Sequence, residues 1–366
     1  MLHRVEKNKN ILLKLNKEEV PQTEFGPPRC VGYFSNGEGS WSPDASQLSY
    51  FYPLELSNIH IDLNHGIETL KYNFYPNEKI DHILKWIVLN YEKILAPPES
   101  QWRKWIEPDF IMTRSQLRKI MIAIYDEKAR WIIRAVKFRG TIYLCPLDTE
   151  ENKRWASNIP HRQKEHMLWG YNFEKFIFTS DPQQPPDLSQ AVNTAETFNC
   201  MFQANLNNKL LMYSAEIDGV ISDKKYDEPL PLDDLKFIEA KTIKYQLPNN
   251  SELKFLNWWC QSYTAGIENI ICAFTNCKGI VNNIKEYKLS DIKQENQVYW
   301  NTECCFNFLD EFLSFLKDRV RDDYSETIYT FTKTPYEGIS MESTPADSST
   351  SFLPKWFTEF KKNMTD

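Results

Sequence analysis

Four charged residues near the middle of the chain have the types and the spacing of a divalent-metal site. Glu216 and Asp218 end one apolar run, and Glu239 and Lys241 lie inside a second one. Both runs are bounded by turn formers, which is typical of strands. Side chains two positions apart on a strand point to the same face, so each pair is expected to share a face. If the two strands pair, three carboxylates and one ammonium meet on a small patch.

Taken singly, each motif also fits a solvated strand that carries charges of both signs, because short patterns of this kind recur by chance. The tandem arrangement favours the metal interpretation, since carboxylates beside a sheet core are costly unless they are paired or metal-bound. Carboxylate oxygens without cysteine or histidine ligands select Mg²⁺ or Mn²⁺ over zinc. The pattern therefore predicts a hard-oxygen cation site with a positive charge beside it.

The elements that must position these residues follow from apolar spacing. Strands are expected over 210–215 and 235–245, and helices over 78–95, 114–125, 162–178, 253–264 and 306–320. Residues 193–204 are also interpreted as a helix, leading into the strand before Glu216. Glu174 lies within the aromatic helix 162–178, where it either reaches water at the edge of the apolar stripe or is buried beside a cation. Residues 102–105 interleave basic and aromatic side chains, which fits a nucleobase-stacking platform or a packed loop.

The length of 366 residues allows one large domain or two ordinary ones. Hydrophobic residues make up 42% and aromatic residues 14%, which indicates a folded globular protein. The sequence contains neither an internal repeat nor a clean linker. We therefore predict a flexible N-terminal arm over residues 1–25 and a single domain over 26–366, with a polar segment near 340–351.

Several protein classes are disfavoured by the sequence. No run approaches the roughly 18 apolar residues that span a bilayer, and the N-terminus lacks the apolar centre of a signal peptide. The eight cysteines have no paired CxxC spacing, so reduced thiols and no zinc site are expected. The net charge of −7 argues against a broad nucleic-acid-coating surface, yet it permits a narrow basic cleft. We expect a protein of the nucleus, the cytoplasm or both that is neither secreted nor bound to a membrane.

The order of five motifs resembles the decapping and exoribonuclease (DXO) family of RNA 5′-end quality-control enzymes. The motifs are Arg114 at a helix start, Gly170-Tyr-Asn-Phe-Glu174, Ala215-Glu-Ile-Asp-Gly219, Glu239-Ala-Lys-Thr242 and Trp258-Trp-Cys-Gln-Ser-Tyr263. The closing Phe352-Leu-Pro-Lys-Trp-Phe357 is also similar to that family. The resemblance covers roughly residues 30–357, and five motifs in one order are far more specific than any one of them.

The resemblance implies an α+β fold with mixed β-sheets and flanking helices, a variant of the metal-dependent PD-(D/E)xK nuclease fold. By motif match, two divalent cations, Mg²⁺ or Mn²⁺, would be bound by four acids and one carbonyl: Glu174, Glu216, Asp218, Glu239 and the backbone of Ala240. Phosphate and water would be positioned by Arg114, Lys241 and Gln261. The catalytic group would comprise Glu216, Asp218, Glu239 and Lys241.

The family's activity implies hydrolysis at RNA 5′ ends that carry an unmethylated guanosine cap, an NAD cap or a 5′-triphosphate, together with 5′→3′ exoribonuclease activity. A monomer is expected, with a nuclear 5′→3′ exoribonuclease as a candidate partner. The alternative is an RNA-binding scaffold for such an exoribonuclease that has lost turnover. Relatives often carry Gly-Phe-Arg where this chain has Ala273-Phe-Thr275, which leaves one contact to the RNA 5′ end and the preferred cap open.

Overall fold

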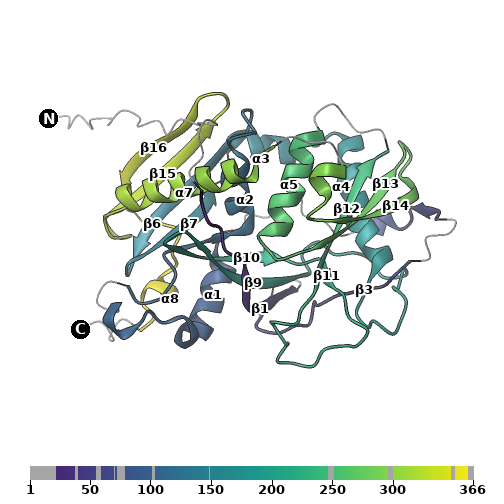
Figure 1. Ribbon diagram of the computed structural model, residues 1–366, viewed down its shortest axis with the longest axis horizontal. Helices are drawn as coiled ribbons and strands as arrows, with labels where there is room; N and C mark the ends of the chain where they lie inside the picture. Colours follow the sequence, from purple (N-terminus) through teal and green to yellow (C-terminus); the bar gives the residue numbers. More distant parts are fainter. Residues whose placement is uncertain are drawn as a thin grey trace.

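Two mixed β-sheets with helices between and outside them form the fold (Figure 1). The computed structural model describes residues 22–37, 40–54, 59–69, 71, 79–100, 104–147, 149–245, 251–295, 300–347 and 351–361. No helix in these ranges is long and apolar enough to cross a membrane. The α+β architecture is the one that the resemblance implies.

The larger sheet has nine strands among the described residues. In spatial order these are β16 (Gly338–Pro345), β15 (Thr327–Thr334), β6 (Trp131–Phe138), β7 (Thr141–Leu147), β5 (Phe110–Thr113), β10 (Lys209–Glu216), β9 (Thr197–Leu206), β1 (Arg29–Gly37) and β2 (Ser40–Ser42). Strand β5 runs parallel to both of its neighbours, whereas the other pairs are antiparallel. The hairpin between β6 and β7 turns at Arg139 and Gly140, both of which have positive φ.

The smaller sheet has seven strands in the described part of the chain. Their spatial order is β4 (Ile61–Asp62), β14 (Ile280–Lys288), β13 (Asn269–Thr275), β12 (Phe237–Lys244), β11 (Gly219–Val220), β3 (Tyr50–Phe51) and β8 (Phe178–Thr179). Strand β12 runs parallel to β13 and antiparallel to β11. This places the second acidic motif in the interior of the sheet.

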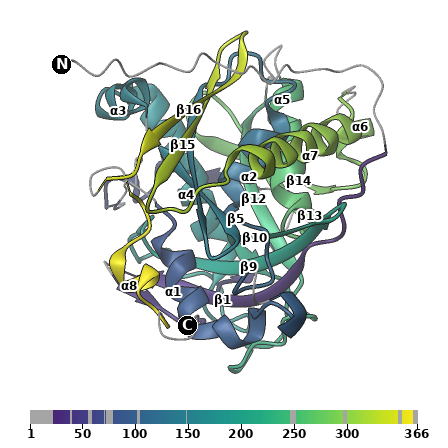
Figure 2. The same ribbon diagram turned by 90° about the vertical axis from the view of Figure 1, so that its left-hand side faces the viewer.

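Three helices separate the two sheets: α2 (Arg114–Ile122), α5 (Ser251–Tyr263) and α7 (Thr302–Arg319) (Figures 1 and 2). Helix α2 packs against both α5 and α7, and one continuous apolar core joins these helices to both sheets. Side chains of α7 such as Phe312 and Leu313 are fully buried, and each such side chain stabilises the fold by about 1.5–3 kcal/mol.

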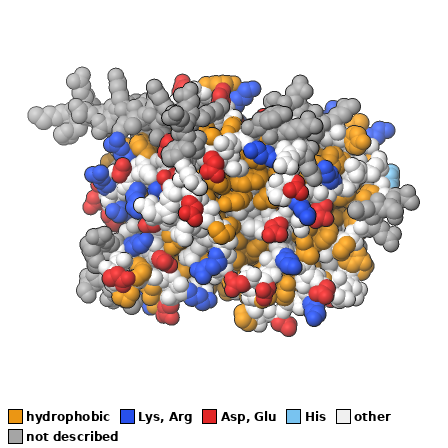
Figure 3. All heavy atoms as spheres, in the orientation of Figure 1, with side chains coloured by type: hydrophobic (Ala, Val, Ile, Leu, Met, Phe, Trp, Pro, Cys, Tyr) orange, Lys and Arg blue, Asp and Glu red, His pale blue; other side chains and the backbone are white. Residues whose placement is uncertain are grey.

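The outer faces of the sheets are covered by other helices. Helices α1 (Asp81–Asn90) and α8 (Lys355–Thr358) cover the larger sheet with a second core. Helix α4 (His161–Ile177) covers the smaller sheet, where Phe173 and Ile177 pack on Ala240 and its neighbours. On the face shown in Figure 3, side chains of both charge signs are interspersed, in keeping with the absence of a broad basic surface there.

One prediction of secondary structure is wrong. Residues 193–204 do not form a helix: β9 occupies most of this range and pairs with β10 in an antiparallel ladder. Its side chains are buried on both faces, so the sequence lacks the alternation that marks a half-buried strand. Much of the polar segment near 340–351 is β16, which pairs with β15 at the edge of the larger sheet.

The N-terminal boundary lies earlier than expected, because Thr23 and Phe25 are buried and Phe25 stacks on Phe306. Residues 1–21 of the predicted arm lie outside the described residues, as do 101–103 of the aromatic and basic segment. Trp105 of that segment is buried and packs edge-on against Phe138 and Phe357, as in a packed loop.

Candidate active site

The first acidic motif lies where the chain crosses from one sheet to the other. Glu216 is the last residue of β10 in the larger sheet, and Gly219 begins β11 in the smaller one. The Ile217 N–H donates to the Phe198 carbonyl, and the Val220 N–H donates to the Ser49 carbonyl. These bonds fix Asp218 between the sheets. The strands over 210–215 and 235–245 therefore do not pair with each other: they belong to different sheets, and β11 pairs with β12 instead.

Gly219 is required at this crossing by close packing. A Cβ atom there would lie 2.5 Å from the ring of Phe178 and 3.2 Å from the Ser49 carbonyl oxygen. Phe178 directly follows α4, so the missing side chain lets the end of α4 approach Asp218.

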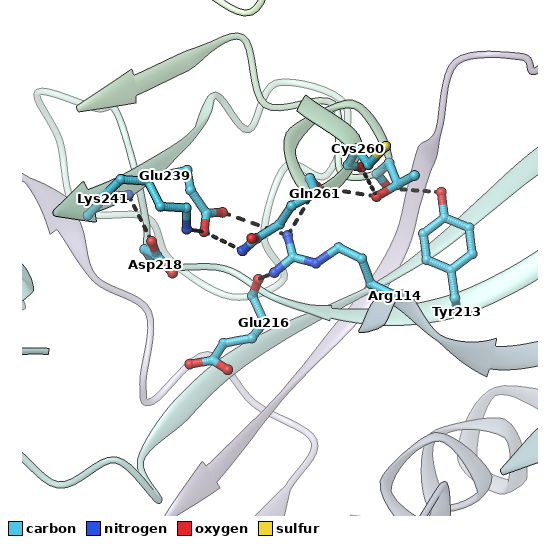
Figure 4. Close-up of polar contacts among 10 residues, drawn as sticks. Arg114, Tyr213, Glu216, Asp218, Glu239, Lys241, Cys260 and Gln261 are labelled. Atoms are coloured by element: carbon cyan, nitrogen blue, oxygen red, sulfur yellow. Dashed lines mark hydrogen bonds and ion pairs between the residues drawn. The ribbon is translucent and has the colours of Figure 1, made fainter. Parts of the chain in front are cut away.

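The second motif is tied to the first through β12. The Ala240 N–H donates to Asp218 Oδ2 over 2.8 Å. Glu239 is 1% exposed, and its Oε1 accepts hydrogen bonds from Lys241 Nζ and from Gln261 Nε2 of α5 (Figure 4). One sheet and one inter-sheet helix thus hold the Glu239 carboxylate.

Arg114 connects the two motifs from the first turn of α2. The helix begins with a capping box in which the Thr113 side chain and Gln116 bond each other's backbone, which fixes where Arg114 emerges. Arg114 Nη2 donates to the Glu216 carbonyl over 2.8 Å, and Nη1 lies 3.8 Å from Glu239 Oε2. Nη1 also donates to the Gln261 carbonyl over 3.4 Å (Figure 4). The guanidinium is therefore oriented by two carbonyls and faces one carboxylate.

Glu174 approaches from the other face of the smaller sheet, in the last turn of α4. With Glu216 and Asp218 it lines a cavity of about 470 Å³, the acidic pocket. Burial raises the pKa of Glu174 well above its usual range, and the carboxylates of Asp218 and Glu216 raise it further. The structure therefore places Glu174 beside the other acids rather than at a solvated helix edge.

The pKa values of Asp218 and Lys241 indicate the same excess of negative charge at the site. Burial, followed by the Glu239 carboxylate, raises the pKa of Asp218 to about 7. Burial lowers the pKa of Lys241, but the Glu239 and Asp218 carboxylates outweigh it and raise the pKa overall. The Lys241 ammonium is thus held charged by the neighbouring carboxylates.

The side chains lie near one another without forming a ready coordination shell. Among the described residues, no three acidic, histidine or cysteine side chains are arranged so that they could hold a metal ion. Glu239 is engaged by Lys241 and Gln261, and the Glu216 carboxylate points away from it (Figure 4). The convergence of three carboxylates and one ammonium on a small patch is therefore met only in part.

The donor set nevertheless fits hard divalent cations. Glu239 Oε2 is buried without a hydrogen-bond partner, and two neighbouring carboxyl groups have raised pKa values. Each observation indicates negative charge that a cation would satisfy, and every donor is a hard oxygen.

The wall of the acidic pocket was missed by sequence reasoning. Besides the acids, it is lined by Tyr171, Phe178 and residues of the segment 179–197, whose last part falls within the wrongly predicted helix 193–204. No short motif marks these residues. Their role follows only from the position of β8 and β9 beside the acids.

Comparison with known proteins agrees with this geometry. A family described as "RAI1 like PD-(D/E)XK nuclease" matches residues 26–358. The Decapping and exoribonuclease protein of Xenopus laevis is 29% identical over 341 residues, which are 90% of this chain and 85% of that protein. Because the family match spans most of the chain, the chain belongs to the RAI1-like PD-(D/E)XK nuclease family.

Two solved structures share the fold. Candida albicans Rai1 in complex with pU5 and Mn²⁺ superposes with a TM-score of 0.80 at 21% identity, covering 97% of this chain and 100% of that one. Scheffersomyces stipitis Rai1 in complex with (3′-NADP)⁺ and a calcium ion gives 0.77 at 15% identity, with coverage of 97% and 100%. Both neighbours thus hold a divalent cation.

Proposed function

We propose that the chain is a metal-dependent hydrolase of RNA 5′ ends, removing NAD caps, incompletely methylated guanosine caps and 5′-triphosphates. The observation that carries the proposal is the acidic pocket. Glu174, Glu216 and Asp218 line it, and the Ala240 N–H bonded to Asp218 ties it to the Glu239–Lys241 pair. A nuclease family and this charge distribution point to the same chemistry.

Each residue has a role that its surroundings allow. Glu174, Glu216, Asp218, Glu239 and the Ala240 carbonyl would hold two divalent cations, which when bound generate a nucleophilic water and stabilise the leaving oxygen. The Lys241 ammonium, kept charged by Glu239 and Asp218, donates to the attacking water or to a phosphate oxygen. Arg114 presents a planar fork that its bonds to two carbonyls hold in place, which suits a phosphate. The amide of Gln261 orients water or nucleotide.

Support for the substrate class comes from the relatives. The Xenopus laevis relative is named a decapping and exoribonuclease protein, and the two structural neighbours contain a 5′-phosphorylated oligouridylate and an NADP-type dinucleotide. Water attacks a phosphorus atom of such a substrate, and the bond from that atom to the leaving oxygen breaks. The product RNA with a 5′-monophosphate would then serve as the substrate for 5′→3′ degradation.

The test compares wild type with Glu216→Ala/Asp218→Ala on NAD-capped and 5′-triphosphate RNA in Mn²⁺ or Mg²⁺. Wild type is expected to release the 5′ group, and the double variant to be slower by at least about 10³-fold, since electrostatic stabilisation is removed. Asp233→Ala/Asp234→Ala removes two exposed acids from the loop before β12 and is the matched control.

Equal product from wild type and the Glu216→Ala/Asp218→Ala variant would contradict the metal-site assignment. Absence of product from wild type on every 5′ end would favour a scaffold over an enzyme.

A further inference from the structure

A second cavity lies at the opposite end of α4 and β12 from the acids. Its volume is about 560 Å³, and we term it the distal pocket. It is lined by Arg162, Lys244, Tyr245, Phe274, Thr275, Asn276, Cys277, Ile280 and Asn282. These residues come from the start of α4, from the end of β12 and the residue after it, and from β13, β14 and the turn between them; the helix and the strands lie side by side at the right of Figure 1.

The distal pocket carries positive charge and no acidic lining residue. Among the described residues, neither Lys244 nor Arg162 forms an ion pair. Their nearness to each other is reflected in His166, whose pKa is lowered by burial and then by Lys244 and Arg162. In a chain with a net charge of −7, two adjacent cations that form no ion pair indicate an anionic ligand.

The rest of the lining suits a nucleobase. Tyr245 is 70% exposed, and its ring lies 6.3 Å from that of Phe274 at an interplanar angle of 73°. An exposed tyrosine beside a second ring offers a face for stacking, and Asn276 and Asn282 supply amides at the same cavity. Aromatic faces next to cations are the pattern of single-strand binding, whereas a surface for an acidic peptide needs no exposed ring.

We propose that the distal pocket binds a nucleotide of the single-stranded RNA body, on the 3′ side of the bond that is cleaved. The inference rests on the proposed function and extends it from the 5′ end to the polymer. Lys244 and Arg162 contact backbone phosphates, and a base stacks on Tyr245.

The distances decide which side of the RNA reaches this pocket. Glu174 and Arg162 are separated by about 18 Å along α4, at 1.5 Å per residue. Lys241 and Lys244 are separated by about 10 Å along β12, at 3.3 Å per residue. On the 5′ side of the scissile bond, a guanosine or NAD cap ends after one or two nucleosides. The continuing 3′ strand is long enough for both distances, so we assign the distal pocket to it.

The rate of Cys277 alkylation reports directly whether a ligand occupies the distal pocket. Cys277 lines the distal pocket and is exposed, whereas the seven other cysteines are buried. In EDTA, which keeps the RNA intact, the rate of Cys277 alkylation by iodoacetamide is measured with free NAD⁺ and with 5′-monophosphorylated RNA of about twelve nucleotides. The longer RNA is expected to slow alkylation at least fivefold, and NAD⁺ to leave it unchanged.

Variants of the distal pocket test whether RNA binding there can be lost while hydrolysis at the acidic pocket is kept. Arg162→Ala/Lys244→Ala is expected to raise the Kd for the long RNA about tenfold or more, and to lower the slope of log K against log salt by about 1.4, since each single-strand phosphate contact contributes about 0.7. Hydrolysis of free NAD⁺ is expected to keep its kcat/KM. Arg154→Ala/Lys355→Ala removes two exposed cations elsewhere and is the matched control. Tyr245→Ala is expected to weaken binding with an unchanged salt slope.

Unprotected Cys277 at saturating RNA would overturn the inference, as would equal RNA affinity of Arg162→Ala/Lys244→Ala and the control. Protection by poly-glutamate equal to that by RNA would also overturn it, in favour of an acidic protein segment. Failure of the proposed function has a different signature: wild type would hydrolyse neither NAD⁺ nor capped RNA, while the alkylation result would still decide what the distal pocket binds.

Discussion

The acidic pocket and the distal pocket lie along the same helix and hold opposite charges. Six acids and one lysine line the first, whereas two cations and no acid line the second. Both arrangements oppose the dipole of α4, because Glu174 is in its last turn and Arg162 in its first. Each such side chain, when ionised, costs roughly 0.3–1 kcal/mol in the free protein. The difference between the pockets teaches that α4 carries an unfavourable charge at each end, which the proposed cations and phosphates would offset.

The largest effect is expected from Glu239→Gln, which tests whether the candidate active site acts through the charge of the Glu239 carboxylate. The amide keeps the shape but no longer balances Lys241 and Arg114, so turnover of NAD-capped RNA should fall at least about 10³-fold. Single-turnover kinetics measures the chemical step directly. Glu286→Gln, at an exposed position on β14, should retain wild-type rates. A rate for Glu239→Gln within tenfold of wild type would show that the carboxylate charge is dispensable.

Gly219→Ala is expected to have the next largest effect, because it separates α4 from Asp218. The new Cβ would meet the Phe178 ring at 2.5 Å, so the end of α4 must move at a cost of about 1–3 kcal/mol. Both the melting temperature and the turnover number should fall. Gly37→Ala, whose Cβ would meet only Ser40 Oγ at 3.5 Å, should change neither. Wild-type turnover in Gly219→Ala would mean that the contact does not position the acids.

The pH dependence of stability distinguishes the two pockets through Asp218. Its pKa is about 7 in the folded protein, above the ordinary 3.8, so the folded state binds this proton more tightly. In chelator, the unfolding free energy should therefore fall as pH rises from about 4 to 7. Mn²⁺ should then stabilise the protein more at pH 8 than at pH 5.5.

Thermal melts of wild type and Asp218→Asn across this pH range measure the effect. The variant should show a flatter profile. An equally steep profile would place the responsible proton on another group.

The smallest effect concerns the helix dipole itself. In chelator, at a pH high enough to ionise Glu174, Glu174→Gln and Arg162→Gln each remove a charge from the unfavourable end of α4, so each should raise the melting temperature by about 1 °C or more. Glu174→Gln should also lose the stabilisation by Mn²⁺, whereas Arg162→Gln should keep it. A lower melting temperature for both variants would show that these charges are already balanced within the free protein.

The sequence predicted which residues form the candidate site better than it predicted how they are arranged in space. Glu216, Asp218, Glu239 and Lys241 stand in short motifs at strand ends, and periodicity is a local signal. The partner of each strand is a non-local property. The insert before β12 carries the chain into a second sheet, so β10 and β12 are in separate sheets.

The wrong prediction of a helix over residues 193–204, where β9 lies, has a related cause. Phe198, Cys200 and Phe202 alternate as a strand requires, but Met201 is also buried because helices cover both faces of the larger sheet. Burial on both faces erases the two-residue period that a single sequence can show. The orientation of the Glu216 carboxylate was equally out of reach, since its neighbours come from segments that meet only after folding.

Because the chain crosses between the sheets at Ile217, the proposed catalytic residues come from both sheets. Glu216 ends a strand of one sheet, and Glu239 lies in a strand of the other. Arg114 contacts both residues. A sub-ångström slip of one sheet past the other would alter the acid spacing without breaking either hydrogen-bond ladder. Turnover is therefore expected to report misalignment of the two halves long before any loss of secondary structure becomes visible.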